Sequence, residues 1–385
     1  MVLRSVQREW CFPENNSQWK TILQVIIIVT FSLVTMLLVV NADDVGYAER
    51  RDDGIFCTLQ QNAGIVTSVS LMVNGQSAVS AGKRLVAMEN RVDVGLHVNL
   101  TEGTPTAPSH QVPTLLEGGY FLGKMGFRTA LREGKISLDQ VRQEIAAQFE
   151  KFHRLLGYHP HHADGHQHIH VLPGVRDVFA SELHKHSVHW TRLPIEPHIT
   201  HACWVSTARR QFYQQITDDA RQSLAVFASH GIASTRHFVG MATMGADMLV
   251  SRIVSEIRQV SRDPQCTSTP SATIASHEVP CAAAVSPPVR TGESQQESVS
   301  PSSSSCTVEL MVHPGYALMA GEGGCGQGPD DFAQSADRDH EVSVLCDAEL
   351  RRQLCDDLQV QLVRWSQLSV TQATMADADP VAAAT

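Results

Sequence analysis

Two adjacent aspartates follow a run of apolar residues early in the chain. Segment 36–46 reads MLLVVNADDVG, so Asp43 and Asp44 come where the apolar, partly β-branched run ends. Such a run predicts a buried parallel strand, which delivers polar residues to the carboxyl end of a sheet or barrel, where α/β proteins have their pockets. Because side chains alternate along a strand, the two carboxylates should point in different directions, so that one could bind a metal while the other acts as a base. The simpler alternative is that one of them caps the next helix.

Histidines supply the other candidate groups. His97 lies near the end of a predicted strand, although a lone strand histidine is more often structural. Segment 161–170, HHADGHQHIH, holds five histidines in ten residues. Imidazole is the commonest metal ligand, and the apolar residues and the glycine in this region favour an ordered site over a solvated histidine-rich loop. One carboxylate and two histidines from different strands would form a facial triad with open positions. A metal there would acidify a bound water and polarise a carbonyl, with a free carboxylate beside it as base.

An alternation of helices and strands is predicted to position these groups. Helices are predicted at Glu49–Asn62, at Ala78–Asn90 and from the capping box Ser137–Gln140 to Gly157. About eight β/α units indicate an α/β fold, a distorted (β/α) TIM-like barrel. Beyond the strand that ends at Asp43, strands are predicted at Thr67–Val73, Val92–Leu100, His162–Asp164, Val188–Arg192, His237–Met241, Thr307–His313 and Val360–Arg364.

Two segments interrupt the alternation. Residues 262–306 are rich in Ser, Pro, Thr and Ala and have few large apolar side chains, so they cannot offset the entropy of ordering and predict a disordered insertion. Residues 373–385 form a low-complexity tail, also predicted to be disordered. The barrel domain is therefore expected at residues 35–261 and 307–372.

The apolar N-terminal segment allows several interpretations. Residues 21–40 are almost uninterruptedly apolar and match a membrane span in length, yet the end of this run is needed for the strand that carries Asp43. The extension 1–34 is therefore a helix packed on the domain, a membrane anchor that borders the strand, or an artefact of the gene model. A dispensable extension is favoured over membrane contact through residues 21–40.

Charge and cysteine content narrow the partners and the compartment. The net charge is −10 and no Lys/Arg cluster occurs, which argues against nucleic acid as a partner. The nine cysteines are scattered and include no Cys-x-x-Cys pair, so neither a disulfide framework nor a cysteine zinc site is indicated. A cytoplasmic location is therefore expected, with membrane anchoring as the alternative. The sequence specifies no oligomeric state.

Five short motifs combine in this chain: Asn41-Ala-Asp-Asp-x-Gly46, Thr67-Ser-x-Ser-x-x-Val-Asn-Gly75, Gly95-Leu-His97, His162-Ala-Asp-Gly-His166-x-His168-x-His170 and His313-Pro-Gly315. Together they resemble the motifs of the YdjC-like carbohydrate deacetylases, most closely the animal members. The resemblance runs from about Met36 to Arg364, interrupted by the insertion. It implies a distorted (β/α) barrel and the removal of acetyl groups from N-acetylated sugars, such as chito-oligosaccharides, with Mg²⁺ as the favoured metal and Zn²⁺ as the alternative.

The same resemblance assigns roles to individual residues. Asp43 matches the family's proton acceptor, which would act on a metal-activated water. His313 lies where a general acid would protonate the leaving amine, and Arg192 either orients Asp43 or the substrate or forms an ordinary ion pair. The residues that match the metal ligands are Asp44, His97 and His166.

Two other functions are compatible with some of these residues. One is a non-catalytic carbohydrate- or metal-binding protein on the same fold, which the retention of Asp43 beside a complete ligand set disfavours. The other is an iron oxygenase of the His-x-Asp type, based on His162-Ala-Asp164. Those enzymes need an antiparallel double-stranded β-helix, and the β/α alternation argues against it.

Overall fold

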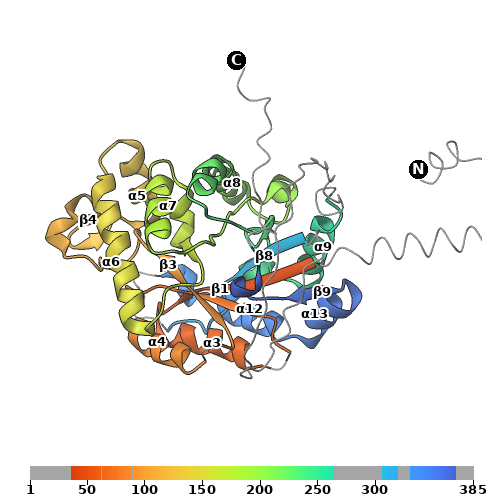
Figure 1. The fold of residues 1–385 in the computed structure, drawn as a ribbon. Coiled ribbons are helices and arrows are strands. Elements are labelled where there is room, and N and C mark those ends of the chain that lie inside the picture. Colours follow the sequence, from red (N-terminus) through yellow and green to blue (C-terminus); the bar gives the residue numbers. More distant parts are fainter. Residues whose placement is uncertain (1–35, 62, 89, 264–305, 320–329, 370–385) are drawn as a thin grey trace, which may run out of the picture. The chain divides into compact units, whose positions relative to one another are not determined.

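The computed structural model describes residues 36–263, except 62 and 89, together with residues 306–319 and 330–369. Seven strands form one parallel sheet with helices packed around it (Figure 1). The strand order is β6-β3-β2-β1-β8-β7, and β9 pairs with β1. The strands of this sheet are β1 (Met36–Val45), β2 (Ser68–Leu71), β3 (Asp93–Val98), β6 (Ala163–Gly165), β7 (His237–Val239), β8 (Cys306–Val312) and β9 (Val360–Leu362), while β4 (Leu116–Glu117) and β5 (Tyr120–Phe121) form a separate antiparallel pair.

β1 is the central strand, and all ten of its residues are buried. Along one edge it pairs with β8 from Met36 to Ala42. Its other edge pairs first with β9 and then, from Asn41 onward, with β2. Because neighbouring strands and helices cover both faces of β1, its sequence begins with a continuous run of apolar residues and does not alternate between apolar and polar ones. The predicted buried parallel strand before the two aspartates is confirmed.

The sheet curls into an incomplete barrel. Within the described residues β6 and β7 are its outer strands, and two isolated parallel bridges, Ala163–Thr191 and Trp190–Ala233, extend the pairing from β6 to Ala233, four residues before β7. The strand expected at Val188–Arg192 is therefore reduced to two bridging residues. Pro194 lies just beyond them and has no N–H with which to extend the pairing. The predicted α/β fold, a distorted (β/α) barrel, is confirmed with this difference.

Helix α6 shows how local sequence sets the bounds of an element. The Ser137 side chain accepts the main-chain N–H of Gln140 at its start, and Gly157 ends it with a left-handed φ of 84°. The Gln140 side chain bonds to Thr114 instead of closing the expected capping box. The α-helices are α3 (Glu49–Gln60), α4 (Ala78–Val86), α5 (Gly123–Arg132), α6 (Leu138–Leu156), α7 (Val175–Lys185), α8 (Thr207–Ser229), α9 (Val250–Val260), α11 (Asp331–Gln334), α12 (Asp337–Leu345) and α13 (Ala348–Arg352).

Several predicted segments lie outside the described residues. These are the extension 1–34, the tail 373–385 and residues 264–305 of the expected insertion 262–306, so the domain boundaries stay predictions. Of the apolar segment 21–40, the last five residues belong to β1. Among the described residues, no helix combines the length and apolar character that crossing a bilayer requires. Cys306 at the start of β8 is disulfide-bonded, which the scattered cysteines did not predict.

Candidate active site

Asp43 and Asp44 lie at an irregularity in β1. The register between β1 and β2 shifts between Ala42 and Val45, so the two aspartates on β1 lie opposite a single residue, Ser70, on β2. Asp44 adopts a left-handed φ of 68°, as residues in β-bulges can. On a regular strand the two carboxylates would point to opposite faces, but here both line the same cavity. They still contact different groups, as expected: Asp43 contacts Arg192, and Asp44 contacts His97 and His166.

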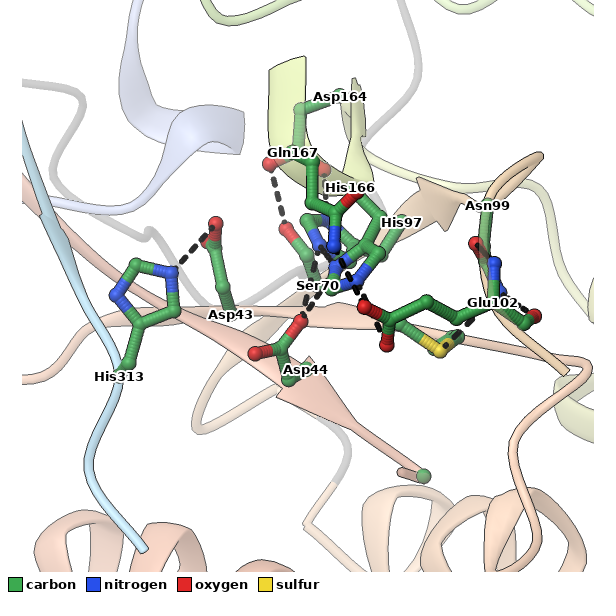
Figure 2. Close-up of polar contacts among 12 residues, drawn as sticks. Asp43, Asp44, Ser70, His97, Asn99, Glu102, Asp164, His166, Gln167 and His313 are labelled. Atoms are coloured by element: carbon green, nitrogen blue, oxygen red, sulfur yellow. Dashed lines mark hydrogen bonds and ion pairs between the residues drawn. The ribbon is translucent and has the colours of Figure 1, made fainter. Parts of the chain in front are cut away.

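Asp44 meets two histidines at the carboxyl ends of neighbouring strands (Figure 2). His97 is in β3, and His166 begins the short 3₁₀ segment η3 (His166–Val171) directly after β6. The Oδ1 atom of Asp44 lies 2.9 Å from Nδ1 of His166 and 3.2 Å from Nε2 of His97, and the two nitrogens are 3.2 Å apart. Ligands about 2.1 Å from one cation lie about 3.0 Å apart in octahedral and about 3.4 Å apart in tetrahedral geometry. One divalent cation therefore fits among these three atoms.

Carboxylates also lie at the outer nitrogen of each imidazole. Nδ1 of His97 is 2.6 Å from Oδ1 of Asp164, and Nε2 of His166 is 3.3 Å from Oε2 of Glu102. Asp164 is itself held by the Ser70 hydroxyl, which donates to its Oδ2 at 2.8 Å. Carboxylate partners of this kind commonly orient metal-binding histidines.

The surrounding charges make the centre attractive to a cation. Burial alone would raise the pKa of Asp44, but His166, His97 and Arg51 hold it well below its usual value. Burial alone would lower the pKa of both histidines. Their carboxylate neighbours instead raise it to about 10 for His97 and about 9 for His166. These charges thus favour either a protonated histidine or a cation bound between the two histidines.

Arg192 connects the two aspartates to the rest of the buried network. Its guanidinium is fully buried and contacts both oxygens of Asp43 at 2.6 Å. The same group reaches Oδ2 of Asp164 at 3.1 Å and donates from Nε to Oε1 of Glu309 at 2.8 Å. Arg192 therefore forms an ion pair with Asp43 and at the same time holds its carboxylate in place. The two alternatives from the sequence, an ordinary ion pair and a residue that orients Asp43, do not exclude each other.

The network also shows which oxygen of Asp43 is open. Oδ1 accepts from both Arg192 and the Asn41 amide, the latter at 2.8 Å. Oδ2 accepts from Arg192 and has Nε2 of His313 at 3.8 Å (Figure 2). A carboxylate oxygen has two lone pairs, so Oδ2 keeps one that is available to a proton.

His313 directly follows β8 and is held by its main chain. Its N–H donates to Oε2 of Glu341 at 2.6 Å, and its carbonyl accepts from Nη1 of Arg338 at 2.9 Å, both on α12. Burial lowers the pKa of His313 to about 4, despite the opposing effect of Asp43 and Asp44. The ring is therefore neutral at neutral pH and must gain a proton before it can act as an acid.

A second group of possible ligands, Asp43, His97 and Asp164, lies beside the first. The possible ligand atoms of this group already have partners, because Arg192 contacts both carboxylates and Asp164 contacts Nδ1 of His97. A cation there would lie next to a guanidinium. The group of Asp44, His97 and His166 is therefore the better metal site.

The cavity above these groups has a volume of about 410 Å³. Five of the six residues that the sequence singled out line it, and the sixth, Arg192, is fully buried in contact with Asp43. Phe212 on α8 and Phe332 on α11 contribute aromatic surface, and Lys124 on α5 adds a cation. A cavity lined by these polar groups and aromatic side chains suits a small polar ligand.

Sequence reasoning missed four charged residues of the site. Asp164 belongs to the histidine-rich motif, and its place two residues before His166 on a predicted strand end was a usable signal. Arg51, Glu102 and Glu309 had no local signal, because their contacts with the site depend on how distant segments pack. Arg51, on α3, contacts Oδ2 of Asp44 at 3.3 Å.

The chain is similar to several known proteins. The model of the family described as YdjC-like protein matches residues 37–356. A human protein named carbohydrate deacetylase is 41% identical over 324 residues, covering 84% of this chain and 88% of the relative. A protein of Escherichia fergusonii named chitooligosaccharide deacetylase is 35% identical over 145 residues, covering 38% of this chain and 54% of the relative.

A solved structure shares the fold. It comes from Enterococcus faecalis V583 and is described as that of a cellobiose-phosphate cleavage protein. The TM-score is 0.55 at 18% sequence identity, and the match covers 87% of this chain and 99% of the other.

Proposed function

The chain belongs to the YdjC-like protein family, and from this premise we propose that it is a metal-dependent hydrolase that removes acetyl groups from N-acetylated carbohydrates. The observation that carries the proposal is the buried triangle of Asp44, His97 and His166 with Asp43 beside it. The names of the relatives supply the substrate class: carbohydrate for the human protein and chitooligosaccharide for the bacterial one.

Asp44, His97 and His166 would hold the cation. When bound there, a divalent cation would polarise the amide carbonyl and lower the pKa of a water molecule. Two imidazole nitrogens and one carboxylate oxygen are the donors of many catalytic zinc sites, whereas Mg²⁺ prefers oxygen donors. The donor set thus favours Zn²⁺, while the family resemblance favoured Mg²⁺, and metal reconstitution distinguishes the two.

Asp43 is proposed as the general base. Its Oδ2 retains a free lone pair and lies 3.8 Å from Nε2 of His313, while its Oδ1 is fully occupied by Arg192 and Asn41. Arg192 acts as a positioning residue, because it fixes the plane of the carboxylate through two short contacts. The proton that Asp43 takes from the attacking water is thereby accepted at one defined oxygen.

His313 is proposed as the general acid. The amine that leaves when the amide C–N bond breaks needs one proton, and the water that adds to the carbonyl supplies one. His313 is neutral at neutral pH, and Oδ2 of Asp43 is 3.8 Å from its Nε2, so the proton taken by Asp43 can pass to this ring and then to the amine. The products are acetate and the free amino sugar.

Acetate release from N-acetylglucosamine oligomers tests the proposal. Protein freed of metal by a chelator should be inactive, and separate additions of Zn²⁺ and Mg²⁺ should identify the metal that restores turnover. Asp44→Asn should abolish both activity and metal binding. If metal-loaded protein binds the oligomers but releases no acetate, a non-catalytic carbohydrate-binding protein is the correct reading. If it neither binds nor cleaves them, the substrate class is wrong.

A further inference from the structure

Glu102 lies in the loop that follows β3, next to the outer side of His166 (Figure 2). Its Oε2 is 3.3 Å from Nε2 of His166, an ion-pair contact that lacks hydrogen-bond geometry, while Nδ1 of the same ring is 2.9 Å from Asp44. The two nitrogens are on different edges of the imidazole. Glu102 therefore contacts His166 away from the proposed cation position and is not one of the converging ligands.

The loop holds Glu102 by its main chain through Asn99. The Asn99 side chain donates from Nδ2 to the carbonyl of Glu102 at 2.7 Å and accepts the Glu102 N–H at Oδ1 at 3.0 Å. Asn99 is itself fully buried at the end of β3. These two bonds tie the backbone of Glu102 to the sheet and set the point from which its side chain starts.

Gln167 fixes the other end of the carboxylate. It donates from Nε2 to Oε1 of Glu102 at 2.6 Å, which leaves Oε2 for His166. Gln167 and His168 both have left-handed backbones, with φ of 55° and 57°. This conformation raises the free energy of a non-glycine residue, so it persists only where the surrounding structure requires it, often at functional sites. Here it places Gln167 against Glu102.

The contact bears on which nitrogen of His166 carries a proton. For Nδ1 to offer its lone pair to a cation, the neutral ring must carry its proton on Nε2, and an acceptor at Nε2 favours that tautomer. Asp164 has the corresponding place at Nδ1 of His97, the nitrogen outside the triangle. Both histidines of the triangle thus have a carboxylate at the nitrogen that must keep its proton.

We propose that Glu102 is a positioning residue whose carboxylate, paired with the Nε2 edge of His166, favours the proton on that nitrogen, and so orients this ring and strengthens metal binding. The inference rests on the proposed metal centre. Glu102 is also better suited to a test than Asp164. Its side chain is 28% exposed and has two polar partners among the described residues, His166 and Gln167, whereas Asp164 is fully buried and shared with His97, Arg192 and Ser70.

The test is the Zn²⁺ affinity of full-length Glu102→Ala and Glu102→Gln, measured by competition with a chromogenic chelator and without any sugar. Loss of a carboxylate that supports a metal ligand typically weakens metal affinity about 10–100-fold, and we expect that range for Glu102→Ala. Glu102→Gln should weaken it less, because an amide oxygen can still accept the proton. The matched control is Glu117→Gln, which removes an exposed charge from β4, away from the ligand histidines.

Two readouts separate the possible outcomes. The melting temperature of the metal-free variants should stay close to that of the parent, because the partly exposed Glu102 side chain fills no core position. Parent-like Zn²⁺ affinity in both Glu102 variants overturns the inference while leaving the metal centre intact. If the parent binds no Zn²⁺ or Asp44→Asn binds it equally well, the metal centre itself is wrong and the inference falls with it.

Discussion

Replacing Asp43 by Asn separates the proposed base from the proposed metal ligands. The amide keeps the shape of the carboxylate but turns one of its two oxygens into a donor. Asp43 meets Arg192 through two contacts of 2.6 Å, and only one of them can survive. The other would bring two donors together.

The stability cost follows from that single lost contact. A hydrogen bond to a charged group contributes about 1.5–3 kcal/mol. Asp164 and Glu309 still compensate the charge of Arg192, so the larger penalty of an unpaired buried ion is not expected. At about 2–4 °C per kcal/mol for a domain of this size, the melting temperature should fall by about 3–12 °C.

Catalysis should suffer much more than metal binding. Removal of a general base typically lowers turnover by about 10²–10⁴-fold. Asp43 is not part of the triangle formed by Asp44, His97 and His166, so the metal affinity should fall by less than about tenfold. Turnover is measured by acetate release at saturating metal, stability by calorimetry of the metal-free protein, and affinity by chelator competition.

Asp53→Asn provides the control. This change removes the same charge from the surface of α3, where Asp53 is 57% exposed and pairs with Arg84, so it should cost at most about 1 kcal/mol. Turnover of Asp43→Asn above a tenth of the parent rate would refute its role as base. Loss of the metal along with activity would place Asp43 among the ligands.

Three further outcomes are expected. Gly95→Ala should destabilise the protein by about 1–3 kcal/mol in thermal denaturation. The new methyl group would lie 2.3–2.6 Å from ring atoms of His162, which is buried and stacks on Trp365, so the ring cannot withdraw. An unchanged melting temperature would show that the ring can move. Zn²⁺ at 100 times its dissociation constant should stabilise chelator-treated protein by about 2.7 kcal/mol in a thermal shift assay, and an equal shift in Asp44→Asn would contradict the ligand assignment. Burial raises the pKa of Glu196 from 4.5 to about 7, so the folded state holds this proton longer than the unfolded state and the free energy of unfolding should fall as the pH rises through that window. Glu196→Gln should flatten this slope in urea denaturation, and parallel slopes would show that another group causes it.

Local patterns sufficed to predict the elements that carry the site. The apolar run before Asp43 predicted the strand that is covered on both sides, and Ser137 and Gly157 mark the ends of α6 through bonds within a few residues. The convergence of Asp44, His97 and His166 also follows from strand ends, since β1, β2, β3 and β6 are successive neighbours in the sheet.

Other features depend on contacts that no local pattern encodes. The irregularity at Asp43 and Asp44 exists only relative to Ser70 on the next strand, so the sequence of β1 alone could not predict that both carboxylates line one cavity. Residues 188–192 have the composition of a strand, yet pairing extends over only two of them. Glu102 reaches His166 across 64 positions of sequence, through a loop whose course depends on the burial of Asn99.

The burial of Asn99 also affects what the cell can attach to this chain. Asn99-Leu-Thr101 matches the acceptor sequence for N-glycosylation, in which a sugar is joined to the asparagine side-chain nitrogen. In the folded chain that nitrogen is inaccessible and donates to the carbonyl of Glu102 at 2.7 Å and to Oδ1 of Asn74 at 3.2 Å. A glycan and the Glu102 loop therefore exclude each other. The folded protein cannot serve as an acceptor at this position, and a chain glycosylated there before folding could not form the loop that brings Glu102 to His166.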